Sequence, residues 1–444
     1  KDEPLILPGV VDQDDATLCG KVFKVQPTKG TDITAELKQA FDDAKTAGPG
    51  SVVDLPEGEF EIEQIEIGEF YGSFVGAGKG RTIISPKTGL DCTVGALITF
   101  TGGDILVSDM TIKTPEESIC ADGSGLVVLL AFADYSDTYV TAENFVRSVV
   151  NNVEFISNKL DEGGYSGYNC WNGLAAGQNT KSASGLNRSN IDMTITNCSF
   201  DSFGFGTQII GAKSGKYTLG TKNNGNTFTN CLEGAFIYDI INMPVKVTGN
   251  KFYIPAASYG LDFSNYADAR FVAESQTSPT VVNIEENKFF ETGSNLGLLI
   301  RDNHRYVYPD ELPMNVQLKN NNFNLNGAIA AIGCFNMNGM VIRNNKFTGN
   351  SLWGVRIMKG GTLYNVNGLM LGNNFSNLSC SMTTVLLNTG SSDWTIVGGD
   401  LGESTLDLGV NNIITGYSVI DPGSPLGQTI VDNLKEMREA SDEY

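Results

Sequence analysis

Residues 341–361 read VIRNNKFTGNSLWGVRIMKGG, and the fold can be inferred from this stretch outward. Apolar and polar residues alternate on both sides of Asn344 and Asn345, which is the pattern of short β-strands. Asparagine tolerates the left-handed backbone and hydrogen-bonds its own main chain, so the pair indicates a tight corner between two strands. Phe347 follows the corner and is expected to point into the interior.

The element N-x-F, with close variants such as NVEF and NCSF, recurs through the chain at intervals of 24 to 45 residues. The eight copies end at Phe155, Phe200, Phe228, Phe252, Phe289, Phe323, Phe347 and Phe375. Most copies follow one short alternation and precede another that starts at a Gly, as in GAFIYDI and GVRIM. The longer intervals indicate inserted loops at about 159–190, 264–280 and 302–314.

A unit of about 25 residues with three short strands cannot bury its own apolar face, whereas stacked units can. We therefore expect an all-β protein, a single-stranded right-handed parallel β-helix. Asparagine side chains should stack in a ladder at one corner of the coils. The phenylalanines should stack beside them in the interior.

Composition excludes several classes of protein. Acidic residues outnumber basic ones by 51 to 30, and the net charge of −21 repels nucleic acid and anionic membranes. No apolar run of about 18 residues is present, so no transmembrane segment is expected. The eight Cys form no CxxC or Cys/His cluster, which argues against zinc. An acidic surface is compatible with calcium, but no ligand loop of known spacing appears.

The start of the chain bears on localisation. Lys1-Asp2-Glu3 lacks an initiating Met, as after removal of a signal sequence. The three residues also resemble the segment that follows the lipidated Cys of exported bacterial lipoproteins. We expect a secreted or extracytoplasmic protein, compatible with a lipid anchor at a bacterial cell surface.

The N-terminal part carries a family resemblance. Residues 32–48 show helical periodicity, and they precede SVVDLPEGEFEI (51–62) and FVGAGKGRTIISP (74–86). This order resembles the start of the pectin-lyase-like superfamily, where a capping helix precedes V-x-L-P-x-G-x-[FY] and then G-x-G-x-x-x-T-x-I. The matching residues are Val53, Leu55, Pro56, Gly58 and Phe60, followed by Gly76, Gly78, Thr82 and Ile84. The resemblance implies a β-helix of the polysaccharide lyase or polygalacturonase type.

Three regions are expected on this basis. They are an N-terminal extension (1–31), the β-helix with its capping helix (32–415) and a C-terminal segment with a short helix (416–444).

Strand alternation predicts two columns of outward side chains on the strand after each Gly. The first should contain Gly206, Phe236, Asp262, Leu299, Ile329 and Arg356, and the second Gln208, Tyr238, Ser264, Arg301, Ala331 and Met358. Because successive coils lie about 4.8 Å apart, Asp262 should neighbour Arg301. Asp239 and Asp302 should lie close to them.

The inserted loops supply further candidates. Loops on one side of a rigid solenoid commonly build its binding face, and aromatic rings suit the apolar faces of sugars. Trp171, Tyr238 and Tyr306 are the aromatic candidates for binding substrate. His304, the only histidine, could act as acid or base near neutral pH, and Arg305 follows it as a candidate binding residue.

GVRIMK (354–359) resembles the G-V-R-I-K coil of polygalacturonase-type glycoside hydrolases, in which the Arg and Lys bind a uronate. A Met is inserted here, so Arg356 keeps the outward position while Lys359 moves to the other face or the turn. The paired Asp motifs and the Gly-His-Gly of that family are absent. The resemblance implies related architecture and an anion-binding Arg356, without the hydrolytic residues.

Two classes of function remain open. The first is an enzyme that cleaves a polysaccharide in a cleft on one outer sheet. A hydrolase would use Asp262 with Asp302 or Asp239 as its two carboxylates. A lyase would use His304, Tyr306, Tyr308 or Lys359 as base, and Arg301, Arg305 or Arg356 to neutralise a uronate. The second class is a non-catalytic glycan-binding or adhesive β-helix.

Overall fold

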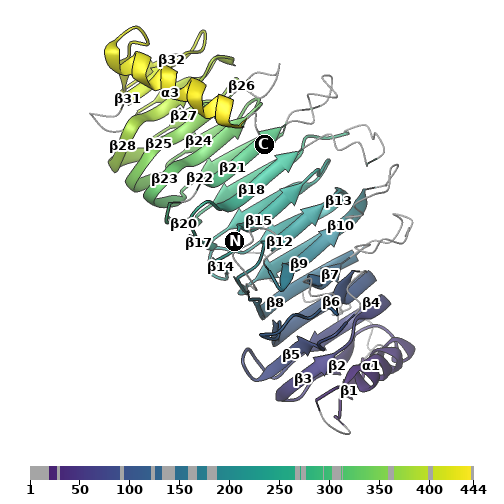
Figure 1. Ribbon diagram of the computed structural model, residues 1–444. Coiled ribbons are helices and arrows are strands. Elements are labelled where there is room, and N and C mark those ends of the chain that lie inside the picture. The colour runs from purple at the N-terminus through teal and green to yellow at the C-terminus, as the bar shows by residue number, and fades with distance from the viewer. Residues whose placement is uncertain are drawn as a thin grey trace. The chain divides into compact units, whose positions relative to one another are not determined.

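The computed structural model describes most of the chain. The described residues are 20–27, 31–90, 95–121, 126–132, 146–158, 168–177, 188–265, 271, 277–293, 295–302, 312, 314–358, 365–398 and 404–441. They form a right-handed parallel β-helix with helices α1 (Thr34–Ala47) and α3 (Pro425–Ser441), as the sequence predicted (Figure 1). No described helix is long and apolar enough to cross a membrane.

The chain divides into two compact units. Unit 1 contains Lys1–Tyr253 and Asp268–Thr280, and unit 2 contains Ile254–Ala267 and Val281–Tyr444. Each unit has three faces of parallel strands, which we call A, B and C. Long strands turn a corner and contribute to more than one face. The three regions expected from the sequence stay a prediction.

Unit 1 has the following strands. Face A contains β1 (Val22–Lys24), β2 (Ser51–Asp54), β4 (Ile65–Val75), β6 (Ala96–Lys113), β8 (Val146–Ile156), β10 (Ser189–Thr196), β13 (Ala212–Leu219) and β16 (Pro244–Thr248). Face B contains β3 (Gly58–Ile62), β5 (Thr82–Pro86), β11 (Ser199–Asp201), β14 (Thr227–Thr229) and β17 (Lys251–Ile254), with parts of β6 and β8. Face C contains parts of β4 and β6, then β7 (Leu126–Phe132), β9 (Cys170–Gly177), β12 (Phe205–Ile210) and β15 (Glu233–Tyr238).

Unit 2 repeats the arrangement. Face A contains β19 (Val281–Glu285), β22 (Asn315–Lys319), β24 (Val341–Arg343), β27 (Leu369–Leu371), β30 (Thr395–Val397) and β32 (Ile413–Thr415). Face B contains β20 (Lys288–Glu291) and parts of β23 (Asn322–Phe335), β25 (Lys346–Met358) and β28 (Asn374–Leu387). Face C contains β18 (Tyr259–Asn265), β21 (Leu296–Asp302), the rest of β23, β25 and β28, β31 (Ser404–Asp407) and β33 (Ser418–Ile420). A separate small sheet pairs β26 (Asn365–Val366) with β29 (Ser391–Ser392).

The predicted asparagine ladder is present in both units. In unit 2 the buried amides of Asn287, Asn321 and Asn345 each donate to the next side chain at 3.0 Å, and the series ends at Asn373. In unit 1, Asn226 donates to Asn250 at 2.9 Å. The ladder satisfies polar groups that the corner would otherwise bury without partners.

The phenylalanine stack confirms the second part of that prediction. Ring centroids lie 4.8–5.0 Å apart from Phe155 through Phe200 and Phe228 to Phe252 in unit 1. In unit 2 the stack runs from Phe289 to Phe375 at 4.3–5.0 Å. One ring per coil therefore fills the interior beside the asparagine corner.

Both helices bury an apolar stripe. Phe41 of α1 lies 5.2 Å from the rings of both Phe70 and Phe74, so α1 covers the apolar interior at the N-terminal end of unit 1. Figure 1 shows α3 crossing the strands of the last coils. Its residues Ile430 and Leu434 pack on outward side chains of face C in unit 2.

Candidate functional site

A cluster of three polar side chains lies on face C of unit 2. Asp262 and Ser264 point outward from β18, and Arg301 comes from the paired strand β21. The Arg301 guanidinium donates to Asp262 Oδ2 and to Ser264 Oγ, both at 2.7 Å. Ser264 Oγ donates in turn to Asp262 Oδ1. The predicted contact between Asp262 and Arg301 is confirmed, and it follows from strand register alone.

Burial separates the members of this cluster. Asp262 is 2% exposed, whereas the Arg301 side chain is 27% exposed. Burial raises the pKa of the Asp262 carboxyl, and the Arg301 guanidinium and the Ser264 hydroxyl oppose that rise. The carboxyl therefore lies behind the guanidinium, which is the group that solvent or a ligand reaches first.

Arg356 is the second guanidinium on this face. Its Cζ lies 4.5 Å from the centroid of the Trp353 ring, and its Nη2 lies 3.7 Å from Met358 Sδ. Among the residues that the structure describes, it has no carboxylate partner and its buried Nε has no acceptor. Burial lowers the pKa of Arg356 to about 10, so the side chain stays charged at neutral pH.

The register corrects the expected columns in two coils. In unit 1, Phe236 pairs with Gln208 and Tyr238 with Ile210, so Gly206 and Gln208 do not occupy the places expected for them.

The second correction concerns the coil next to Arg356. Ile329 was expected in its column, but the residue paired with Arg356 is Gly333, which also pairs with Leu299. The expected column used Gly327 as the marker of the strand start. In this coil Ala331 stands in register with Gly297 and Gly354. No glycine therefore marks the start of the face C strand here. The outward residue after Gly333 is accordingly Phe335, and Ala331 does not occupy that place.

Asp302 does not face Asp262. It pairs in register with Asn265, three residues beyond Asp262, and it has the inward alternation of Ile300. Its Oδ2 accepts the backbone N–H of Met314 at 3.2 Å, so it anchors the chain where β22 begins. The structure therefore does not place these two carboxyls opposite one another as a catalytic pair.

Asp239 belongs to unit 1 and has a cation of its own. Arg188 Nη2 donates to its Oδ2 at 2.9 Å, and both side chains are buried. The Arg188 guanidinium also lies 5.1 Å from the ring centroid of Phe271. The sequence analysis missed Arg188, because it lies at the end of the inserted loop of about 159–190 and no repeat spacing connects it to Asp239.

Two aromatic residues predicted to bind substrate, Trp171 and Tyr238, lie on face C of unit 1 with Phe236, which was expected in an outward column, and with Phe205, which was not predicted. Trp171 lies 5.3 Å from Phe205, Phe205 stacks on Phe236 at 4.9 Å, and Phe236 contacts Tyr238 at 5.4 Å. All four rings are half-buried. We call these four residues the aromatic row. Alternation identified Phe236, but it would place Phe205 inward with Thr207 and Ile209, so no sequence signal identified Phe205.

The remaining candidates, His304, Arg305, Tyr306, Tyr308 and Lys359, lie outside the described residues. Within the described ranges no group of three or more His, Cys, Asp or Glu side chains could hold a metal ion. A calcium site, which the acidic composition allows, stays a prediction.

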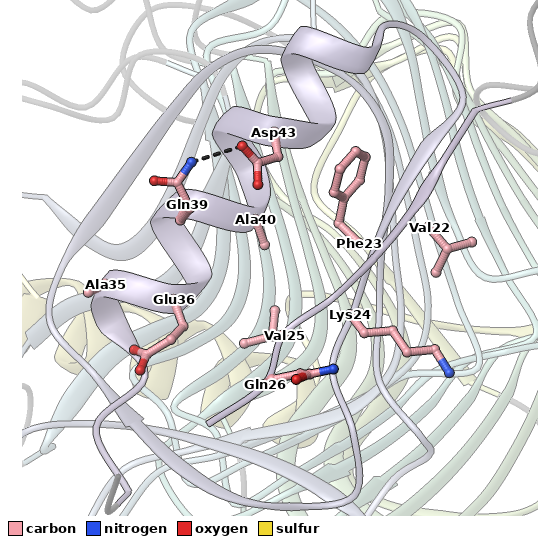
Figure 2. Close-up of a pocket in the computed structure, with 10 residues that line it drawn as sticks. All are labelled: Val22, Phe23, Lys24, Val25, Gln26, Ala35, Glu36, Gln39, Ala40 and Asp43. Atoms are coloured by element: carbon pink, nitrogen blue, oxygen red, sulfur yellow. Dashed lines mark hydrogen bonds between the residues drawn. The ribbon is translucent and has the colours of Figure 1, made fainter. Parts of the chain in front are cut away.

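A shallow pocket lies at the N-terminal end of unit 1, between β1 and α1 (Figure 2). Phe23 and Lys24 line it from the strand, and Gln39 and Asp43 from the helix, where Gln39 donates to Asp43 at 2.8 Å. None of the predicted site residues lines this pocket.

Comparisons with known proteins agree on the fold. No family model and no curated protein matches the chain. A DFA-IIIase from Arthrobacter chlorophenolicus in complex with GF2 is 11% identical with a TM-score of 0.52, covering 86% of this chain and 95% of that one. An Azotobacter vinelandii mannuronan C-5 epimerase A-module is 14% identical with a TM-score of 0.39, covering 90% and 96%. A GH87 alpha-1,3-glucanase catalytic unit from Streptomyces thermodiastaticus is 16% identical with a TM-score of 0.43, covering 91% and 69%.

Identities this low speak for the fold alone, and a fold does not imply a function. The fold that these proteins share is the right-handed parallel β-helix.

Proposed function

We propose that this protein binds and cleaves an acidic polysaccharide on face C of unit 2. The observation that carries the proposal is the Arg356 guanidinium, which has no carboxylate partner within the described ranges although the chain has a net charge of −21. A partly buried cation without a counter-charge is costly to the fold. A carboxylate on a ligand would supply the missing counter-charge and hydrogen-bond acceptor.

The neighbouring residues fit the same ligand. Trp353 supports the Arg356 guanidinium from one side, while Asp262 and Ser264 hold the half-buried Arg301 in a fixed orientation. Two oriented guanidinium groups on one face suit a uronate-containing chain.

Elimination is the cleavage chemistry that we favour. Hydrolysis needs two carboxyl groups that flank one bond. In the described part of the chain Asp239 pairs with Arg188, Asp262 pairs with Arg301, and Asp302 anchors Met314. A lyase instead needs a cation at the uronate carboxylate and a base, for which His304, Tyr306, Tyr308 and Lys359 remain the candidates.

The second candidate function is glycan binding without cleavage. The three described Asp candidates are each 0–2% exposed, so none presents a carboxylate to solvent. This observation favours a binding face with guanidinium groups and no general acid among them.

We also propose a location outside the cytoplasm. The disulfide bond of Cys120 supports it, since disulfides persist in oxidising compartments.

The test compares the wild-type protein with Arg356→Ala and with Arg343→Ala, an exposed arginine on face A of the same unit. Polygalacturonate, alginate and neutral dextran are each assayed for retention, for new absorbance near 235 nm and for new reducing ends. We expect an acidic glycan to be retained, and Arg356→Ala to weaken its binding about 10–100-fold, as for a lost charged hydrogen bond. Arg343→Ala should change binding less than twofold.

Absorbance together with reducing ends identifies a lyase, and reducing ends alone a hydrolase. Retention with neither signal identifies a binding protein. Unchanged affinity in Arg356→Ala, or retention of dextran only, would overturn the acidic-glycan proposal.

A further inference from the structure

The aromatic row on face C of unit 1 is a surface that the proposed function does not use. Trp171, Phe205, Phe236 and Tyr238 come from three successive strands, β9, β12 and β15. With adjacent strands about 4.8 Å apart, the row extends about 10 Å along the solenoid axis. Its rings are half-buried, whereas the phenylalanines of the interior stack are at most 2% exposed.

Trp171 lies flat against the sheet. A Cβ atom added at Gly204 would lie 2.8–3.0 Å from three atoms of the indole, so only glycine lets the ring approach this closely. The six-membered part of the indole therefore covers Gly204 with one face. The Tyr168 ring meets the indole edge-to-face at 6.3 Å, and the Trp171 residue retains exposed area.

Four outward positions on face A of the same unit carry charged side chains and no aromatic rings. Asp104, Arg147, Asp192 and Lys216 stand in register on four strands and alternate in charge. Arg147 lies 3.3 Å from Asp104 and 3.6 Å from Asp192, and Lys216 lies 3.7 Å from Asp192. The outer side of face A is thus covered by ion-paired charged side chains. The outer side of face C carries the aromatic row at the comparable positions.

Among the described register partners of the row, one side chain is acidic and the others are uncharged. The register partners of Phe205 are Asn172 and Glu233, and that of Phe236 is Gln208. The nearby cation Arg188 is neutralised by Asp239. The described neighbours of the row thus supply no unneutralised cation, and on a chain of net charge −21 this disfavours an anionic ligand.

We propose that the aromatic row is a second glycan-binding site, which takes the C–H faces of uncharged sugar rings in an oligosaccharide. The flat indole provides the first stacking surface, and the edges of Phe205, Phe236 and Tyr238 continue it across the coils. Amphipathic rings of this kind gain apolar contact with a sugar at low entropic cost. The site is separate from Arg356, and its ligand differs from the acidic glycan proposed there.

The experiment is affinity electrophoresis of the full chain in gels that contain neutral polysaccharides, namely dextran, xylan, inulin, a β-glucan and galactomannan. The variants are Trp171→Ala and Phe236→Ala. The matched control is Tyr71→Ala, which removes an aromatic side chain that is 48% exposed on face A of unit 1. Thermal unfolding of each variant reports whether the substitution acts through stability.

We expect retardation by at least one neutral polysaccharide, weakened about tenfold by Trp171→Ala and by Phe236→Ala, and unchanged by Tyr71→Ala. The Arg356→Ala variant should bind that polysaccharide like the wild type, which separates this site from the acidic-glycan proposal. The inference is overturned if none of the five polysaccharides retards the wild-type protein. It is equally overturned if the row variants lower the unfolding temperature but retain full affinity.

Discussion

At the scale of the residue, the corner of each coil depends on two different uses of asparagine. Asn344 adopts a left-handed backbone, with φ of 54°, and Asn345 then stacks its amide in the buried ladder. Gly249 and Gly372 take the left-handed place in other coils, with φ of 71° and 62°. The first position therefore requires only tolerance of positive φ, whereas the second requires an amide that both donates and accepts.

Asn321→Ala should be strongly destabilising for this reason. Asn321 accepts the backbone and side-chain N–H groups of Asn287 and donates to the carbonyl of Ile284, all of them buried. Leaving these groups without partners should lower the free energy of unfolding by about 2–4 kcal/mol. Urea unfolding measures it, with the exposed neighbour Asn322→Ala as a control expected within about 0.5 kcal/mol. Equal effects of the two variants would contradict a structural role of the ladder.

At the scale of the element, α1 shows how one helix closes a solenoid. The apolar residues Leu37, Phe41 and Ala44 recur at helical spacing and are buried against the first strands. Directly before the helix, Asp32 Oδ1 accepts the backbone N–H of Thr34 at 3.0 Å and its hydroxyl at 2.7 Å. The helix ends at Gly48, whose φ is 98°.

The stability of this cap should depend on acid pH. Hydrogen bonds from Thr34, and then Lys87, lower the pKa of Asp32 from 3.8 to about 2. A carboxyl with a depressed folded-state pKa stabilises the fold above its unfolded pKa, and that stabilisation is lost as pH falls from about 4 to about 2. The difference in unfolding temperature between wild type and Asp32→Asn should therefore be constant above pH 5 and shrink towards pH 2. A difference independent of pH would contradict this assignment.

At the scale of the whole molecule, the three-faced solenoid restricts each coil to contacts with its neighbours. Phe347, for example, stacks on Phe323 at 5.0 Å and on Phe375 at 4.3 Å, one coil away on each side. Stability in such a chain is approximately a sum of coil terms and nearest-neighbour terms. Damage to one coil should accordingly stay local.

Phe347→Ala should open the adjacent coils selectively. Removing a buried ring costs about 3–5 kcal/mol. In hydrogen-exchange mass spectrometry we expect loss of protection in β23, β25 and β28 of unit 2, and unchanged protection in β8 and β11 of unit 1. The exposed neighbour Lys346→Ala should change neither. A uniform loss of protection across both units would show a single cooperative fold instead.

Part of the candidate site was predictable and part was not. The contact between Asp262 and Arg301 followed from alternation and from a well-marked strand start. The column position of Ile329 was wrong, because Ala331 replaces the glycine that marks the strand in other coils. The pair of Arg188 with Asp239 was not predictable, because Arg188 lies at the end of an inserted loop and belongs to no repeated position of the coils.

The sequence by itself determined the solenoid. The repeat of an asparagine corner, a Phe and an alternating strand is a local pattern, and each coil buries its apolar face against its two neighbours alone. Only the tertiary structure decided which charges are satisfied. Arg301 has a partner while Arg356 has none among the described residues, and Asp302 points to Met314 and not to Asp262. Register places side chains near each other, but burial and hydrogen-bond geometry determine which of them a ligand can reach.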